Sequence, residues 1–181
     1  NTRYVIYNPE QQPLKNPYAF GNAWFVDKLD MVDNADAEIE ALNTIDPLRT
    51  AVVDKRFQED LEGFVPQKDS TATIVLEEYR PNRLTYKSKA DKEQLAVFSE
   101  VYYQPGWKAT VDGKEVPHFR ADWILRGMRV PAGEHTIVFE FRPSGYVTAA
   151  YVSSYSSFLI LLLLIAAIGW SGWKYWKKSK E

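Results

Sequence analysis

The residues best suited to ligand recognition form a mixed aromatic and charged group in the second half of the chain. They are Tyr102, Tyr103, Trp107, Arg120, Asp122, Trp123 and Arg126. Aromatic side chains combine a large apolar face with polar character and can stack on sugar rings, and the charged side chains could supply polar contacts. The alternative is that Trp107 and one of the two tyrosines fill a protein core, because neighbouring residues in a strand point to opposite faces. We prefer packing as the interpretation and keep glycan binding as the alternative.

Patterns for catalysis or metal binding are missing from the sequence. It contains no cysteine and only two histidines, His118 and His135, with no G-x-S-x-G motif near either. Glu77 and Glu78 are adjacent in a predicted strand and point to opposite faces, so they cannot form the carboxylate pair of a glycoside hydrolase. We therefore expect no catalytic residue, no metal and no cofactor in this chain, and we expect both histidines to be structural or on the surface.

Acidic residues are concentrated between positions 27 and 62, where eleven acidic side chains stand against four basic ones. The D-x-[DN]-x-[DN]-G spacing of a calcium-binding loop is absent from this segment. We interpret these residues as solvated surface charge.

Apolar and polar residues alternate with period two along much of the chain, which predicts half-buried strands. The expected strands are 4–7, 23–32, 72–80, 83–88, 95–103, 107–111, 115–119, 123–130 and 134–141. A short helix is expected over 34–43, and a second over about 57–64. Asp112-Gly113 between two strands is a strong hairpin signal, and turns every 8–12 residues are typical of sandwiches. The predicted fold is mainly β: an antiparallel β-sandwich or jelly-roll-like domain with one or two short helices.

A window without ionisable side chains runs for 31 residues, from Pro143 to Trp173. A helix needs about 20 apolar residues to cross a bilayer, so the window predicts a transmembrane helix, which we place at 151–173. Aromatic and basic residues at its ends are typical of membrane interfaces. The expected interface anchors are Tyr151, Tyr155, Trp170, Trp173, Lys174, Trp176, Lys177 and Lys178.

The lysines after this window predict the orientation, because short basic segments stay in the cytoplasm. Residues 174–181 would form a cytoplasmic tail, and residues 1–150 an extracytoplasmic domain at a bacterial cytoplasmic (inner) membrane. Residues 1–150 carry 18 Lys and Arg against 23 Asp and Glu, a net charge of −5. An acidic domain argues against nucleic acid as a partner. A domain outside the cytoplasm without cysteines is more usual for bacteria than for secreted animal proteins.

Four segments, in this order, resemble the C-terminal part of the YfhO family of bacterial membrane proteins. They are Asn1–Ile6 (NTRYVI), Asn22–Val26 (NAWFV), Tyr102–Lys114 (YYQPGWKATVDGK) and Val130–Pro143 (VPAGEHTIVFEFRP), followed by a last span and a basic end. The resemblance implies a large multispanning protein related to glycosyltransferases that use lipid-linked sugars. It also implies that the catalytic acid of that superfamily lies near the start of the polytopic region, where no residue of this chain corresponds.

The leading hypothesis is a non-catalytic accessory domain with the last membrane span of a YfhO-like protein involved in transferring sugars to envelope polymers. Its expected partners are the lipid bilayer, upstream transmembrane helices of the same polypeptide and an envelope glycan. The chain starts at Asn1 in a strand-like run without a signal peptide, which favours a longer polytopic protein over a cleaved signal. The alternative is a single-span, membrane-anchored module that binds a carbohydrate or a protein. No pattern supports an independent hydrolase.

Overall fold

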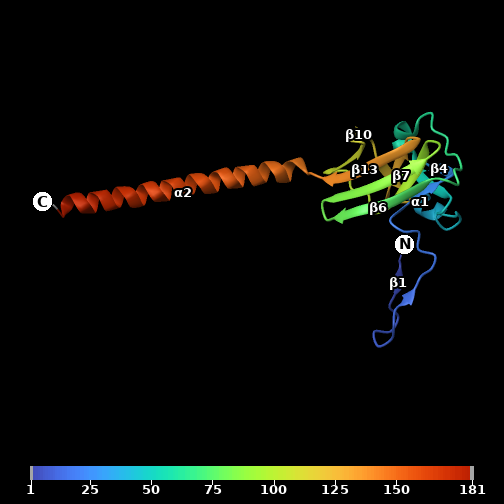
Figure 1. Cartoon of the computed structure of the whole chain (residues 1–181), viewed down its shortest axis with the longest axis horizontal. Helices are drawn as coiled ribbons and strands as arrows, with labels where there is room; N and C mark the ends of the chain where they lie inside the picture. The colour runs from blue at the N-terminus through green and yellow to red at the C-terminus, as the bar shows by residue number, and fades with distance from the viewer. Residues whose placement is uncertain (1, 180–181) are drawn as a thin grey trace. The chain divides into compact units, whose positions relative to one another are not determined.

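The computed structural model describes residues 2–179, except for the side chains of Ser144, Val147 and Lys178. The chain forms two units, Asn1–Phe141 and Arg142–Glu181. We call the first unit the β domain, because most of its regular elements are strands (Figure 1). The second unit contains one long helix, α2 (Ser144–Lys178).

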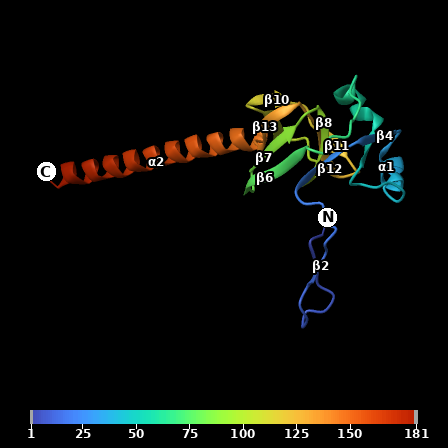
Figure 2. The ribbon, with the colours of Figure 1, turned by 45° about the vertical axis from the view of Figure 1, so that its right-hand side comes forward.

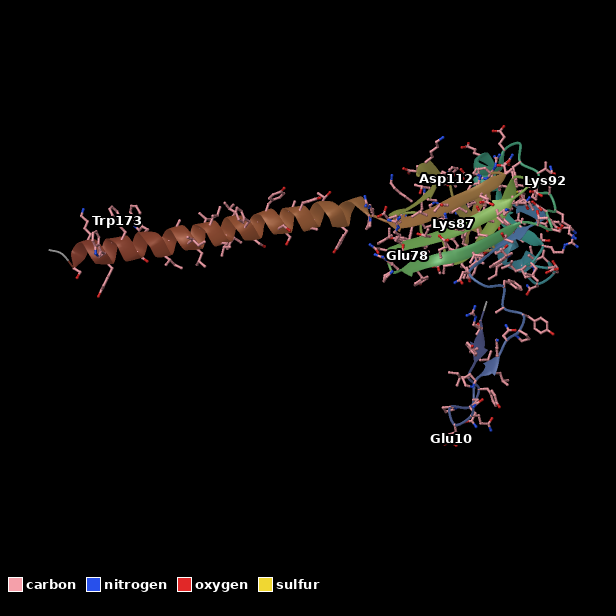
Figure 3. The ribbon with its side chains drawn as sticks, in the orientation of Figure 1. Glu10, Glu78, Lys87, Lys92, Asp112 and Trp173 are labelled. Atoms are coloured by element: carbon pink, nitrogen blue, oxygen red, sulfur yellow. The ribbon has the colours of Figure 1, made fainter. Side chains whose placement is uncertain are left out.

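The larger sheet of the β domain has five antiparallel strands. In spatial order they are β10 (Lys114–Val116), β9 (Trp107–Val111), β13 (Gly133–Phe141), β7 (Arg83–Ala90) and β6 (Thr73–Arg80). Burial alternates along β7, as the period-two pattern predicts. Asp112 and Gly113 connect β9 to β10 with φ angles of +50° and +80°, the left-handed backbone that a two-residue hairpin requires. The hairpin prediction is confirmed (Asp112 is labelled in Figure 3).

A second antiparallel sheet has four strands and packs against the first. In spatial order they are β11 (Phe119–Ala121), β12 (Leu125–Val130), β8 (Gln94–Val101) and β3 (Ala23–Val26). Tyr86, Phe98 and Phe139 meet between the sheets, and the Phe98 ring lies 4.9 Å from each of the other two in edge-to-face contact. Such contacts add about 0.5–1.5 kcal/mol per pair beyond burial. The predicted β-sandwich is confirmed.

The four-stranded sheet is covered on its other face as well. That layer consists of β4 (Lys28–Val32), α1 (Ala35–Ala41), β5 (Thr50–Asp54) and the 3-10 helix η1 (Lys55–Leu61). A second apolar core lies beneath it, with Trp24, Val97 and Phe119 from the sheet and Val53 and Leu61 from the cover. In Figure 2, β8, β11 and β12 accordingly lie between β6 and β7 on one side and β4 and α1 on the other. Central strand β8 is therefore buried on both faces over 94–98.

Three differences from the predicted elements arise in this outer layer and at the sheet edge. The run 23–32 is divided at Asp27 into β3 and β4, which belong to different sheets. The run 115–119 is likewise divided, because β10 joins the larger sheet and β11 the smaller one. Strand β5 was not predicted, and it pairs in parallel with β4. All five of its residues are buried, so it has no alternation to detect.

The two ends of the chain have simple local structure. Strands β1 (Tyr4–Val5) and β2 (Leu14–Lys15) form a short antiparallel hairpin. In α2, the stretch Thr148–Lys177 is 30 residues long and apolar enough to cross a membrane, and none of its most apolar window is buried in the protein. At 1.5 Å per residue, about 20 such residues already match the ~30 Å bilayer core. Helix α2 thus has the length and surface of a transmembrane helix.

Candidate functional site

The structure places six of the seven predicted recognition residues in two separate groups, and Tyr102 belongs to neither. Tyr103, Trp107 and Arg126 line one open cavity of about 340 Å³. We call this cavity the Arg126 pocket; its lining residues are Pro81, Glu100, Val101, Tyr103, Trp107, Arg126 and Phe141. The pocket is shallow and wide open to solvent. The other predicted residues contact different parts of the domain.

Arg126 is the polar centre of this pocket. Its side chain is only 2% exposed, and its Nε donates a hydrogen bond to the Val101 carbonyl oxygen at 3.0 Å. The guanidinium carbon lies 4.1 Å from the centroid of the Trp107 ring and 5.2 Å from that of Phe139, which are cation–π distances. Burial lowers the pKa of Arg126, but a guanidinium stays charged at neutral pH. A fixed cation therefore lies against the aromatic wall.

One nitrogen of this guanidinium, Nη1, is buried and has no hydrogen-bond partner within the described part of the protein. An unsatisfied buried donor typically costs about 1–3 kcal/mol, and such a group in a native protein calls for a specific explanation. Because Nη1 has almost no accessible surface, a ligand in the cavity would contact the part of the guanidinium that lines the pocket rather than this atom.

A bulge in one strand lies at the pocket. Opposite the adjacent residues Leu125 and Arg126, β8 has two extra residues between Phe98 and Val101. This bulge contains Glu100 and places it beside the aromatic side chains; bulges are often used to redirect side chains at sites. On the opposite side, Phe141 ends β13 and pairs with Trp107 of β9, with 5.3 Å between their ring centroids.

Glu100 is half-buried and provides the acceptor of the pocket. Burial raises the pKa of its carboxyl group, while the Arg126 charge acts in the opposite direction. Glu100 and Arg126 both line the cavity, and among the described residues they interact electrostatically without a hydrogen bond. Sequence reasoning missed Glu100 and Phe141. The only sequence signal for Glu100 as a site residue was its position next to the predicted group that begins at Tyr102. The strand bulge that places Glu100 at the pocket has no sequence signature.

The second group is organised around a buried carboxylate, Glu38 of α1. Its side chain is fully buried and accepts hydrogen bonds from Arg120 Nη2 at 2.6 Å and from the Trp123 backbone N–H at 2.9 Å. Arg120 also lies 3.5 Å from Asp54, which in turn pairs with Arg56. The interpretation of the 27–62 acids as solvated charge is therefore wrong for Glu38 and Asp54, whereas most of the other acids in this segment are exposed. These contacts join α1 and β5 to the β11–β12 turn.

Asp122 and Trp123 form that turn, with φ angles of +49° and +69°. Asp122 Oδ1 accepts a hydrogen bond from the Val52 N–H at 2.9 Å, and the Asp122 N–H donates to the Val52 carbonyl oxygen at 2.8 Å. Burial raises the pKa of Asp122 to about 6, and nearby Glu38 contributes to the rise. Asp122 therefore holds the turn to β5 and does not line the Arg126 pocket.

Tyr102 belongs to neither polar group. Its ring lies 5.7 Å from those of Phe57 and His118, edge-on in both cases. Burial lowers the pKa of His118 to about 4, so His118 is neutral at physiological pH. His135 contacts the carboxylate of Asp112 at 2.6 Å and the carbonyl oxygen of Ala132 at 3.0 Å. Both histidines therefore make structural contacts.

Metal binding finds no support in the described part of the chain, where no three His, Cys, Asp or Glu side chains are grouped as potential ligands. Glu77 is the extra residue of a bulge in β6, and Glu78 pairs with Arg80 at 2.6 Å. Glu77 and Glu78 therefore do not form the carboxylate pair of a glycoside hydrolase.

The predicted interface anchors lie along α2, where their described side chains are exposed. Tyr151 stacks on Tyr155 with 6.5 Å between ring centroids, and Trp170 lies edge-on to Trp173 at 5.6 Å (Trp173 is labelled in Figure 3). Trp176, Lys174 and Lys177 follow in the last turns of the helix. The side chain of Lys178 lies outside the described residues. Their role as anchors remains a prediction.

A β-sandwich followed by an exposed apolar helix of bilayer length is the architecture of a membrane protein. A protein-family model described as "Bacterial membrane protein YfhO" matches residues 58–153, which is just over half of the chain. The chain therefore belongs to the YfhO family of bacterial membrane proteins. No curated protein and no solved structure matches the chain.

Proposed function

We propose that this chain is the extracytoplasmic accessory domain and last membrane span of a YfhO-family protein that takes part in sugar transfer at the bacterial cell envelope. In this proposal the β domain is not catalytic. It holds or orients an acceptor glycan, while the reaction takes place in other parts of the membrane protein. The C-terminus lies in the cytoplasm, and the lipid bilayer and upstream helices of the same polypeptide are the partners of α2.

The Arg126 pocket is the observation that carries this proposal. Aromatic side chains from three segments line it together with a largely buried guanidinium and a carboxylate. Apolar surface combined with a few fixed polar groups is the usual composition of a small-molecule site. Sugars match it because a pyranose has apolar C–H faces and a rim of hydroxyls that both donate and accept hydrogen bonds.

The test is a titration of the full chain in lipid nanodiscs with soluble fragments of bacterial envelope polysaccharide. Trp107→Ala removes the ring that supports Arg126, and we expect it to weaken binding by about tenfold or more, consistent with the loss of roughly 1.4 kcal/mol or more. Trp123→Ala is the matched control, because Trp123 lies in the β11–β12 turn outside the pocket. Equal affinity of the wild type and Trp107→Ala would refute glycan binding at this site.

A further inference from the structure

The Arg126 pocket contains one donor and one acceptor rather than a cluster of cations. The Arg126 guanidinium that lines the pocket can only donate hydrogen bonds, and an ionised Glu100 can only accept them. A ligand that satisfies both must offer an acceptor and a donor close together. Two neighbouring hydroxyl groups on a sugar ring meet this requirement, because each hydroxyl can donate and accept.

An acidic ligand fits the same pocket poorly. A carboxylate or phosphate could accept from Arg126, but it has no proton to give to Glu100 and would bring a second negative charge beside it. Like charges in close contact across an interface cost several kcal/mol. Glu100 sits on the bulge of β8 and lines the pocket. The β domain as a whole is also acidic, which adds to the repulsion of anions.

The aromatic residues of the pocket have two different roles, positioning of Arg126 and stacking on the ligand. Trp107 has the Arg126 guanidinium 4.1 Å from its ring centroid, so it serves to position that cation. Tyr103 is 53% exposed, and its ring lies 6.5 Å from that of Phe141. The exposed Tyr103 face is therefore the surface on which an apolar sugar face can stack.

We infer that the Arg126 pocket binds an uncharged hexose unit through two neighbouring hydroxyls, one accepting from Arg126 and one donating to Glu100, and that Glu100 selects against acidic sugars. The inference rests on the proposed function and adds the class of sugar and a specificity-determining residue. Tyr103 supplies the stacking surface, and Trp107 acts as a positioning residue for Arg126.

The experiment measures the affinity of the full chain in nanodiscs for two matched probes: a neutral glucan hexasaccharide and its C6-carboxylated counterpart. The wild type is expected to bind the neutral probe about tenfold more tightly or better. Glu100→Gln keeps a hydrogen-bonding side chain of the same size but removes the charge, and it should lose most of this preference by gaining affinity for the carboxylated probe. Tyr103→Ala should weaken the binding of both probes to a similar degree.

The outcomes separate the two proposals. Tighter binding of the carboxylated probe by the wild type, or a preference unchanged in Glu100→Gln, would overturn the inference while leaving glycan binding by the pocket intact. If Tyr103→Ala and Trp107→Ala both bind the probes with the affinity of the wild type, the glycan binds elsewhere. That result would overturn the proposed function too. Failure of the wild type to bind either probe would also contradict both. Circular dichroism of each variant confirms that the β domain is folded.

Discussion

Asp122 shows how a buried carboxyl group makes the stability of this domain depend on pH. It is 5% exposed, its Oδ2 has no hydrogen-bond partner among the described residues, and burial raises its pKa to about 6. In the unfolded chain the group has a pKa near the ordinary value of 3.8. The folded state therefore binds more protons than the unfolded state between these two values. The stabilisation is complete below the unfolded pKa and is lost as the pH rises through the folded pKa.

Asp122→Asn should therefore stabilise the folded chain at pH 8 and have little effect at pH 4. The amide keeps an oxygen to accept from the Val52 N–H, and Asn tolerates the left-handed backbone well. The expected gain at high pH is about 1–3 kcal/mol, since each pKa unit corresponds to about 1.4 kcal/mol. Urea unfolding of the full chain in detergent, followed by near-ultraviolet circular dichroism, measures the difference at each pH. Asp30→Asn, at an exposed position of β4, is the control, and a pH-independent difference for Asp122→Asn would contradict the explanation.

Residue types alone could identify which side chains were unusual but not which of them meet. Arg120 and Arg126 are direct partners across β11 and β12, yet Arg120 binds Glu38 whereas Arg126 lies against Trp107. The sequence could indicate Tyr103, Trp107 and Arg126 as candidate recognition residues, and the structure places them in one pocket. The sequence could not separate them from Arg120, Asp122 and Trp123, because that separation depends on a buried acid 82 residues from Arg120 in the chain.

At the scale of elements, the close contact between β11 and β12 depends on a glycine. A Cβ atom at Gly127 would lie 2.4 Å from Cε2 and 2.9 Å from Cδ2 of Phe119, its cross-strand partner. Phe119 is 1% exposed and belongs to the core beneath the covering layer of β4, α1, β5 and η1. Its ring therefore has little room to move. The absence of a side chain at Gly127 leaves the space that the Phe119 ring occupies.

Gly127→Ala should therefore destabilise the β domain by about 1–3 kcal/mol, the usual range for overpacking a core. The same urea titration measures this loss. Combining it with Phe119→Leu, which removes the clashing ring atoms, should give a double variant more stable than the sum of the two single effects predicts. Gly145→Ala is the control, because a Cβ atom there has no neighbour within 4 Å. Equal stability of Gly127→Ala and the wild type would show that Phe119 can move aside.

The elements that sequence patterns predicted are those with one buried face. The long strands of the larger sheet alternate clearly, and the hairpin at Asp112-Gly113 has its own turn signal. Strand β5 has no exposed face, so periodicity could not identify it. Residues 23–32 read as one strand because apolar residues recur through both β3 and β4 and no Gly or Pro lies between them. Their separation at Asp27 depends on tertiary contacts, namely the hydrogen bonds of Asp27 and Lys28 N–H to the Arg49 carbonyl oxygen.

At the scale of the whole molecule, two cores on either side of one sheet explain how a domain without cysteines is held together. Strand β8 contributes Ala96 and Phe98 to the core between the two sheets. It contributes Leu95 and Val97 to the core beneath the covering layer of β4, α1, β5 and η1. Unfolding either face would therefore expose the central sheet, so we expect the β domain to unfold as one cooperative unit. Burial of apolar surface at about 25 cal/mol per Å² supplies this stability without disulfides.

The charges at the end of α2 make the orientation of the chain testable. Lys174 and Lys177 follow the apolar stretch, and basic residues beside a span favour the cytoplasmic side. Because the chain contains no cysteine, single cysteines can report the location of each end. Lys114→Cys in the β10 hairpin and Ser179→Cys after α2 are both exposed positions. A membrane-impermeant maleimide should label Lys114→Cys in intact spheroplasts and Ser179→Cys only after permeabilisation, with the cysteine-free chain as the control. Labelling of both positions before permeabilisation would exclude a membrane-spanning α2, and the reverse pattern would place the β domain in the cytoplasm.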